Sequence, residues 1–370
     1  MLNITCPQDT LYEKVQLVSH GVSGRSTQPI QNNMCLKAAG GALTLVATDL
    51  EYISLKSTVP VTIADEGELT VPARTLVDIC NRLPSGDVSL VATENNALEI
   101  SSGKAHFTIR GLPADDFQEL PAIESPVSLE MSQSELARVL NRTVFATSTD
   151  ETRPILTGTL FKISGTQLET VATDTYRLAL QKTELPAEVE KDQSAIISRR
   201  TLQELERILN ATSDEPVVIN MSDSQVSFEL NDVVVACRLI EGQFVNYPKV
   251  IPEGGDRVVT VERRALISTL ERALVVARDD ANRVVVRTSD GTMTVTAESQ
   301  DIGKAEEELP VKVEGKDAEI AFNAQFLLAM LNAVQAEEIS MELSGPLNSG
   351  LIRPAEDDSY LYVLMPMQIM

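Results

Sequence analysis

Adjacent acidic residues are the groups in this sequence best suited to catalysis. Examples are three aspartate pairs and one glutamate run: Asp115-Asp116, Asp279-Asp280, Asp357-Asp358 and Glu306-Glu307-Glu308. A two-metal nuclease needs carboxylates that converge from separate strands on a pair of ions. Acidic neighbours within one loop or strand are more typical of solvated surface. A metal-dependent nuclease or other hydrolase is therefore kept only as an alternative.

Other signatures of enzymes are missing from the sequence. The histidines His20 and His106 lie in unrelated contexts, and GxSxG, HExxH, P-loop and GxGxxG motifs do not occur. The segment GVSGRS around Gly24 lacks the spacing and the lysine of a phosphate-binding loop. Asp49 and Asp174 recur in register, which favours a structural role in a turn. The sequence predicts no catalytic residue, no cofactor and no metal site.

Composition indicates a folded chain with aliphatic cores. Of the 370 residues 43% are hydrophobic and 4% aromatic, with no Trp, which is typical of two or three globular domains. No apolar run is long enough to cross a bilayer, and MLNITCPQDT does not resemble a secretory signal. Four scattered cysteines are expected to be reduced and buried in a cytoplasmic protein: Cys6, Cys35, Cys80 and Cys237.

The chain contains three copies of one pattern, about 125 residues apart. A strand recurs as LTLVATDLEYISL, LETVATDTYRLAL and MTVTAESQDIGKA. A strand that leads into a helix recurs as LTVPARTLVDICNRL, SAIISRRTLQELERIL and AEIAFNAQFLLAMLNAV. This period is the length of a whole domain rather than of a solenoid unit. The sequence predicts three domains, at 1–122, 123–250 and 251–370.

Each copy has two stretches in which apolar residues follow helical spacing. These stretches are 8–21, 72–83, 132–147, 198–209, 261–276 and 323–334. Ser132 followed by Glu135 is typical of a helix start. Segments rich in β-branched residues lie between them, and hairpin turns are expected at 40–41, 102–103 and 290–291. The predicted fold class is α+β, with two helices and roughly eight antiparallel strands in each copy.

Charge is distributed unevenly between the predicted helices and the rest of the chain. The net charge of −23 argues against simple adhesion to nucleic acid, since a duplex repels an acidic body. The helical stretches hold 11 basic and 8 acidic residues, which leaves 20 basic and 46 acidic residues elsewhere. Solvated helix faces explain this pattern. Helices that line one surface facing a polyanion explain it too, with phosphate contacts that ignore base sequence.

Several segments together resemble the β sliding clamp of bacterial DNA polymerase III. They are TVPARTLVDICNRLP, GLPADDF, TVATDTYRLAL, EGQFVNYPKVIP and the terminal YVLMPMQIM. The resemblance covers essentially the whole chain. It implies a head-to-tail homodimeric ring of six clamp domains, with helices inside and sheets outside, that encloses duplex DNA. It also implies a non-catalytic processivity factor, set on DNA by an ATP-driven clamp loader, that tethers polymerases and repair proteins.

The resemblance also assigns site residues. A hydrophobic pocket between the second and third domains would bind short linear motifs of client proteins. Its walls would be Leu156, Thr173, Thr175, Tyr176, Arg177, Leu178, Val245, Lys249, Val250, Ser349, Val363, Met365, Pro366 and Met367. The DNA-facing residues would be Arg25, Arg74, Arg199 and Arg200. At the subunit interface, Phe107 and Ile109 would meet Val275 and Val276.

The sequence departs from the family pattern within this pocket. Many members have Gly-His where this chain has Thr175-Tyr176, and often Pro where Val245 stands and a basic residue where Gln368 stands. These changes keep the pocket apolar but alter its expected peptide preference. A specialised or drug-resistant clamp relative is therefore a second alternative. We further expect TYRLAL in the second copy to turn towards the third domain, whereas LEYISL in the first copy needs only to pack.

Overall fold

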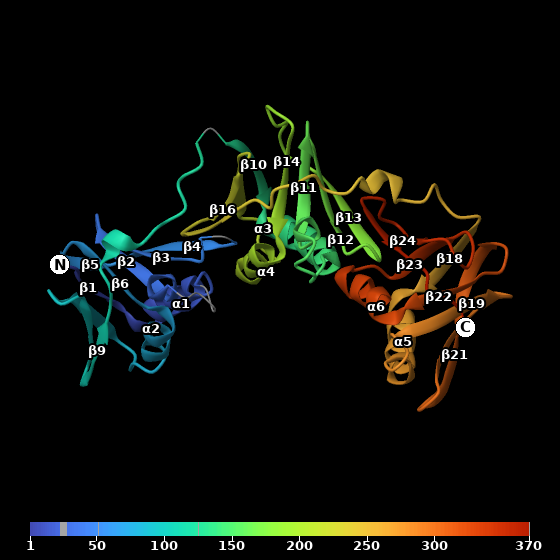
Figure 1. Ribbon diagram of the computed structural model, residues 1–370, viewed down its shortest axis with the longest axis horizontal. Helices are drawn as coiled ribbons and strands as arrows, with labels where there is room; N and C mark the ends of the chain where they lie inside the picture. The colour runs from blue at the N-terminus through green and yellow to red at the C-terminus, as the bar shows by residue number, and fades with distance from the viewer. Residues whose placement is uncertain (23–27, 51, 125, 370) are drawn as a thin grey trace. The chain divides into compact units, whose positions relative to one another are not determined.

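The computed structural model describes residues 1–22, 28–50, 52–124 and 126–369 (Figure 1). By its internal contacts the chain divides into two compact units. Unit 1 comprises Met1–Ala137 and Leu185–Ile240, and unit 2 comprises Arg138–Glu184 and Glu241–Met370. The division passes through the second sequence repeat, so each unit contains one whole repeat and part of the second.

The α-helices of the described residues occupy the stretches predicted for them. They are α1 (Gln8–Ser19), α2 (Ala73–Cys80), α3 (Gln133–Thr143), α4 (Arg199–Ile208), α5 (Arg263–Ala277) and α6 (Ala324–Ala333). The side-chain oxygen of Ser132 accepts a hydrogen bond of 3.2 Å from the Glu135 N–H, as the predicted helix start requires. Within the described ranges, no helix is long and apolar enough to cross a membrane.

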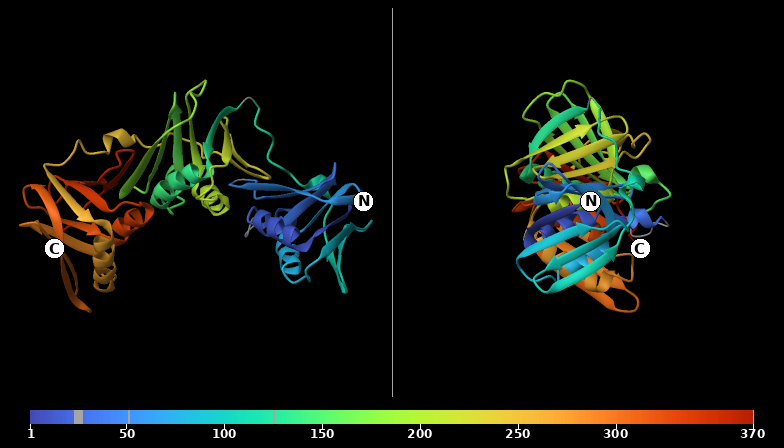
Figure 2. Two further views of the ribbon diagram at one scale, coloured as in Figure 1. Left: turned by 180° about the vertical axis from the view of Figure 1, so that it is seen from behind. Right: turned by 90° about the vertical axis from the view of Figure 1, so that its left-hand side faces the viewer.

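Unit 1 is built on antiparallel sheets. Its strands are β1 (Asn3–Pro7), β2 (Asn33–Ala39), β3 (Ala42–Thr48), β4 (Ser54–Pro60), β5 (Thr62–Asp65), β6 (Gly67–Pro72), β7 (Asp87–Ala92), β8 (Ala97–Ser102), β9 (Ala105–Arg110), β10 (Val127–Ser132), β14 (Gln193–Ser198), β15 (Pro216–Met221), β16 (Gln225–Leu230) and β17 (Val233–Arg238). One sheet has the order β5-β1-β7-β8-β9, and another has the order β10-β15-β16-β17-β4-β3-β2-β6. Helices α1 and α2 lie side by side (Figure 1, Figure 2).

Unit 2 contains one long antiparallel sheet. Its strands are β11 (Gly158–Ser164), β12 (Gln167–Thr173), β13 (Arg177–Glu184), β18 (Arg257–Glu262), β19 (Arg283–Ser289), β20 (Thr292–Ser299), β21 (Gly303–Gly315), β22 (Glu319–Asn323), β23 (Glu338–Leu343), β24 (Gly350–Pro354) and β25 (Tyr360–Leu364). They follow the order β11-β12-β13-β25-β24-β23-β18-β21-β20-β19-β22. Helices α5 and α6 lie side by side against its strands (Figure 1).

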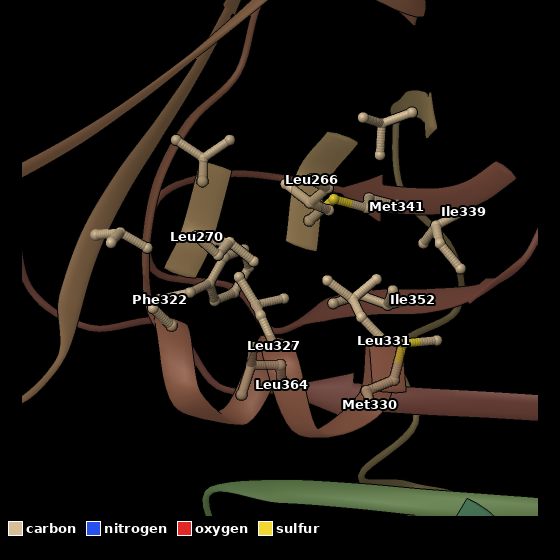
Figure 3. Packing of buried hydrophobic residues seen from close by; sticks show 14 of the residues in the cluster. Leu266, Leu270, Phe322, Leu327, Met330, Leu331, Ile339, Met341, Ile352 and Leu364 are labelled. Atoms are coloured by element: carbon tan, nitrogen blue, oxygen red, sulfur yellow. The ribbon is translucent and has the colours of Figure 1, made fainter. Parts of the chain in front are cut away.

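The core of unit 2 is aliphatic, as the composition predicts. Leu266 and Leu270 of α5 face Leu327 and Leu331 of α6, and the strands supply side chains such as Ile352 (Figure 3). Each of these five residues is at most 2% exposed. Burying one such side chain contributes about 2 kcal/mol, so the helices are held on the sheet chiefly by apolar contact.

Two of the predicted hairpins have turns that need a left-handed backbone at both central residues. Gly40 and Gly41 have φ of 60° and 83°, and Asp290 and Gly291 have φ of 50° and 76°. Such paired positive φ values are typical of the two-residue turns that match strand twist. The third hairpin, between β8 and β9, also has a glycine in this region, Gly103 with φ of 57°.

Each junction between consecutive repeats is a strand pair. β17, the last strand of the second repeat, pairs with β4 of the first repeat, and Val235 lies opposite Leu55. β25, the last strand of the third repeat, pairs with β13 of the second repeat, and Tyr362 lies opposite Ala179. The second copy therefore turns towards the third, as expected. The expectation that LEYISL needs only to pack is wrong, because its strand makes the same kind of junction.

The turn after the repeated VATD is one residue shorter in the second copy. Val46 lies opposite Lys56 in the first copy, whereas Val171 lies opposite Leu180 in the second. A shift of one residue exchanges the two faces of a strand. The two sequences align without a gap, so the alignment of VATDLEYISL with VATDTYRLAL conceals this change of face.

The two aspartates of VATD have the structural role predicted for them. Asp49 accepts hydrogen bonds of 2.8 and 2.9 Å from the N–H groups of Tyr52 and Ile53. Asp174 accepts bonds of 3.0 Å from the N–H groups of Tyr176 and Arg177. Each carboxylate thus closes its own turn, and the shorter turn places Arg177 at the start of β13.

Candidate functional site

The pairing of β13 with β25 brings predicted pocket residues together. Leu178 lies opposite Val363, and the Met365 N–H donates a 2.9 Å hydrogen bond to the carbonyl of Tyr176. β24 pairs with the other side of β25, and Ser349 directly precedes Gly350 at the start of β24. Residues nearly two hundred positions apart in the chain therefore lie at one strand junction.

The turn before β13 is fixed by a threonine. Thr173 donates a 2.6 Å hydrogen bond to the carbonyl of Arg177 and accepts one of 3.1 Å from the Thr175 N–H. Thr175 has φ of 80°. A β-branched residue in this left-handed region is strained, whereas glycine is not. The strain is located in the turn that presents Tyr176.

The Arg177 side chain makes hydrogen bonds and aromatic contacts within unit 2. Its Nε donates to Asp174 at 2.9 Å and its Nη2 donates to the carbonyl of Phe145 at 2.8 Å. The guanidinium carbon lies 4.2 Å from the ring centre of Phe326 and 5.5 Å from that of Phe145. The Arg177 side chain is only 12% exposed. Its charge is therefore already paired, and it serves to brace the site rather than to present a free cation.

Phe145, Phe326 and the Arg177-binding role of Asp174 are absent from the sequence prediction. Phe145 follows α3 in the 3-10 turn Val144–Ala146, and Phe326 lies on α6. In the sequence both are ordinary apolar residues of helical stretches. Only the packing of the turn Val144–Ala146 against β13, and of α6 against β25, shows that they contact Arg177.

The remaining residues predicted for the pocket are Leu156 and residues that follow β17. Leu156 ends the 3-10 turn Pro154–Leu156, and its carbonyl accepts a 2.8 Å hydrogen bond from the Ser148 N–H. A Cβ built on Gly242 would lie 2.8 Å from Cγ2 of Ile155, so the chain after β17 passes close to this turn. Val245, Lys249 and Val250 belong to that same passage.

The C-terminal segment that carries Met365 and Met367 is hydrogen-bonded to its own repeat and also lies next to the β13–β25 junction. The Met367 N–H donates a 2.7 Å hydrogen bond to the carbonyl of Ala321, and Arg283 donates to the carbonyl of Gln368 at 3.1 Å. Met365 nevertheless remains 47% exposed. The C-terminal segment can therefore pack within its own repeat and still leave Met365 open at the predicted pocket.

Exposure separates the predicted pocket into a buried floor and an open rim. Leu156, Thr173, Leu178 and Val363 are each at most 5% exposed. Tyr176 is 63% exposed, Val250 50% and Met365 47%. An apolar rim around a rigid floor is the surface that a short amphipathic peptide can cover.

The predicted DNA-facing arginines differ in their surroundings. Arg25 lies outside the described residues. Arg74 is exposed on α2, and Arg199 is half-buried at the start of α4. Arg200 lies 2.5 Å from Asp49 and donates to the carbonyl of Val22 at 3.1 Å, so part of its hydrogen-bonding capacity is used inside unit 1. Contact of these arginines with DNA stays a prediction.

Two of the three aspartate pairs have a member in an ion pair. Asp357 binds Arg142 at 2.8 Å, and Asp280 binds Arg283 at 2.5 Å. Across the described ranges, no group of three His, Cys, Asp or Glu side chains could hold a metal ion. The four cysteines are free and buried, as predicted. Burial raises the pKa of the Cys6 thiol to about 11 and that of Cys35, Cys80 and Cys237 to about 12.

Comparison with known proteins assigns the family. Models of the DNA polymerase III beta subunit match three successive stretches: its N-terminal domain at 2–121, its central domain at 130–248 and its C-terminal domain at 248–368. The chain belongs to the DNA polymerase III beta subunit family. The sequence resemblance and the predicted fold class of three clamp domains are thereby confirmed.

Curated relatives and solved structures of this family cover the full chain. The beta sliding clamp of Vibrio cholerae is 32% identical and that of Synechocystis 35%, each over 100% of both chains. The sliding clamp of Bacillus subtilis has a TM-score of 0.96 at 30% identity, again over 100% of both chains. The clamp of Bartonella birtlesii bound to griselimycin has a TM-score of 0.95 at 33% identity, with the same coverage. Beta subunits are accessory to the polymerase and are not themselves enzymes, so the nuclease alternative is not favoured.

Proposed function

We propose that this chain is the processivity clamp of a bacterial replicative DNA polymerase. It would encircle duplex DNA as a head-to-tail homodimer in the cytoplasm and tether polymerases, the clamp loader and repair proteins through the pocket at the β13–β25 junction. The observation that carries the proposal is the match of all three family domains, in order, along the whole chain. Neither a membrane partner nor a cofactor enters the proposal.

The strand junctions support ring closure. Each last strand of a repeat, β17 or β25, pairs with the fourth strand of the repeat before it. In the described chain the equivalents of these junction strands at its two ends have no such partner: β9, which ends the first repeat and pairs with β8, and the first half of β21, which pairs with β20. A second copy of the chain would offer each edge its complement, so that two chains close on themselves.

The registers of the two internal junctions predict the register of this intermolecular one. Carried over by equivalent positions, they place Phe107 opposite Ala305, His106 opposite Glu306 and Thr108 opposite Lys304. Phe107 is 40% exposed, and Ala305 and Val276 both pack on the core of unit 2. Phe107 thus still has aromatic surface that a partner strand could cover.

The remaining predicted interface residues differ in what they can contribute. Val275 is 63% exposed and therefore available to a partner. Ile109 is only 7% exposed in the single chain, so its role is to support β9 from within. The net charge of −23 fits retention by encirclement, because general attraction to DNA would be weak.

Topological retention is the decisive experiment. The clamp, loaded by its clamp loader, should stay on nicked circular DNA in 0.5 M salt and leave when the DNA is linearised. A mass measurement in solution should give twice the 40.3 kDa of the chain. Equal loss from circular and linear DNA, or a monomer at micromolar concentration, would contradict the ring.

A clamp specialised for particular clients is a second candidate function. It is favoured by the strained Thr175 and the 63% exposed Tyr176 at the rim of the pocket. Complementation separates the two candidates. The chain should replace the resident clamp for bulk replication if it is the housekeeping clamp, and only under drug or DNA damage if it is a specialised one.

A further inference from the structure

The segment between the second and third repeats is buried and hydrogen-bonded at its centre. We call residues 241–256 the connecting segment. Tyr247 is only 7% exposed although it lies outside the sheets. The Tyr247 N–H donates to the carbonyl of Val245 at 2.7 Å, and the Val250 N–H donates to the carbonyl of Tyr247 at 2.9 Å. The 3-10 turn Tyr247–Lys249 is thus framed by proposed pocket residues.

Tyr247 is anchored by a carboxylate on β12. Its hydroxyl donates a 2.5 Å hydrogen bond to Oε2 of Glu169. Lys162 on β11 and Lys182 on β13 lie opposite Glu169, with ammonium nitrogens 3.5 and 3.7 Å from its carboxylate. A charged acceptor fixed between two cations makes a strong, directional hydrogen bond to the phenol.

The titration of Glu169 agrees with this arrangement. Burial by itself would raise the pKa of the Glu169 carboxyl. The hydrogen bond from Tyr247 and the two lysines outweigh that effect and hold the pKa below its usual value. Burial and the same bond raise the pKa of Tyr247. At neutral pH the carboxylate is therefore charged and the phenol keeps its proton to donate.

Glu169 shares a face of β12 with the pocket. Side chains alternate along a strand, so Glu169, Val171 and Thr173 point to the same side. Thr173 is a proposed pocket residue that lies about 13 Å along the strand from Glu169, at roughly 3.3 Å per residue. The hydroxyl of Tyr247 therefore attaches the connecting segment to the face of β12 that carries Thr173.

We propose that Glu169 and Tyr247 are positioning residues for client binding. Their hydrogen bond holds the connecting segment so that Val245 and Val250 stand in one place at the pocket rim. This inference rests on the proposed function of the pocket. Without the bond the turn samples more conformations, and only the fraction in the binding arrangement accepts a ligand. The sheet itself keeps its Lys162–Glu169–Lys182 row and its stability.

Two substitutions test the proposal with griselimycin, the compound bound in similar clamps. Tyr247→Phe removes only the hydroxyl and should weaken griselimycin binding about fivefold to tenfold in calorimetry. Glu169→Gln keeps an acceptor without its charge and should weaken binding about twofold to threefold. Glu184→Gln is the matched control, because Glu184 on β13 accepts a 2.5 Å hydrogen bond from Thr166 in the turn between β11 and β12. The control should bind like the native chain.

Hydrogen exchange separates positioning from direct contact. In the absence of ligand, Tyr247→Phe should speed exchange of the Lys249 and Val250 amides at least tenfold and leave the β12 amides unchanged. This measurement also decides the case if Tyr247→Phe is too unstable for calorimetry, since Glu169→Gln should show a smaller change at the same amides.

Three results would overturn the inference. One is griselimycin affinity within twofold of the native value in Tyr247→Phe. Another is weakened binding with unchanged exchange in the connecting segment, which would mean that the hydroxyl touches the ligand. The third is that neither the native chain nor Arg177→Ala binds griselimycin. That result would contradict the proposed pocket, and this inference with it. In the first case, if the native chain binds griselimycin and Arg177→Ala abolishes that binding, the proposed pocket is supported and only the positioning role is overturned.

Discussion

Asp174 and Arg177 form a 2.9 Å ion pair inside the short turn that leads into β13. The equivalent aspartate of the first repeat, Asp49, instead binds Arg200 of the second repeat at 2.5 Å. One carboxylate of the repeated motif thus joins two repeats, while the other braces the proposed pocket. The shorter turn in the second copy makes this difference possible, because it puts an arginine within reach of its own aspartate.

Arg177→Ala should weaken client-peptide and griselimycin binding at least tenfold. The guanidinium is the one group that joins Asp174, the Phe145 carbonyl and the Phe326 ring. Its loss leaves a mostly buried carboxylate unpaired, so the free energy of unfolding should fall by about 2 kcal/mol. Calorimetry and chemical denaturation measure the two effects. Arg207→Ala, at an exposed pair with Glu204, should change stability by less than about 0.5 kcal/mol. Undiminished affinity in Arg177→Ala would show that the pocket lies elsewhere.

Thr175→Gly should stabilise the chain by about 1 kcal/mol, because glycine adopts φ of 80° without strain. Thermal unfolding measures the change. Thr294→Gly on β20, where φ is not positive, is the control and should destabilise the chain by a similar amount. A lower melting temperature in Thr175→Gly would contradict the assignment of strain to this turn.

Phe107→Asp should raise the dimer dissociation constant at least tenfold, since it places a charge at the centre of the proposed β9–β21 junction. Sedimentation equilibrium measures the constant. Leu347→Asp, at a residue 76% exposed in the loop before β24, should leave it unchanged. Adding Ala305→Lys to Phe107→Asp should restore part of the affinity, because the inferred register puts the two side chains opposite each other. No recovery in the double variant would argue against that register.

Asp357→Asn should destabilise the chain at neutral pH by about 1 kcal/mol and have no effect in strong acid. Burial raises the pKa of Asp357, but hydrogen bonds from Ser359 and Arg142 outweigh it and hold that pKa below the usual 3.8. A lowered pKa contributes stability that is present above pH 3.8 and lost as pH falls through the folded-state value. Denaturation from pH 7 to pH 2 tests this dependence. Asp358→Asn is the control, because the Asp358 side chain is 96% exposed. A pH-independent difference between native and Asp357→Asn chains would contradict the ion-pair explanation.

The sequence by itself determined the repeat, the helices and the family. Apolar spacing placed the six α-helices of the described residues, and the recurrence of VATD and of the strand–helix segments revealed three copies. These features follow from local periodicity, which a chain must satisfy wherever its elements finally pack. The predicted floor of the pocket also came from the sequence, through segments such as TYRLAL and YVLMPM that resemble one family.

Only the tertiary structure decided what the repeated residues do. The one-residue difference between the VATD turns is invisible in an ungapped alignment, yet it changes which side chains of β13 point to each face of the sheet. Phe145, Phe326 and Glu169 carry no signal in the sequence, because their roles depend on neighbours far along the chain. A ring stacked on a guanidinium or a carboxylate aligned with a phenol is a contact between distant segments, and packing alone brings such groups together.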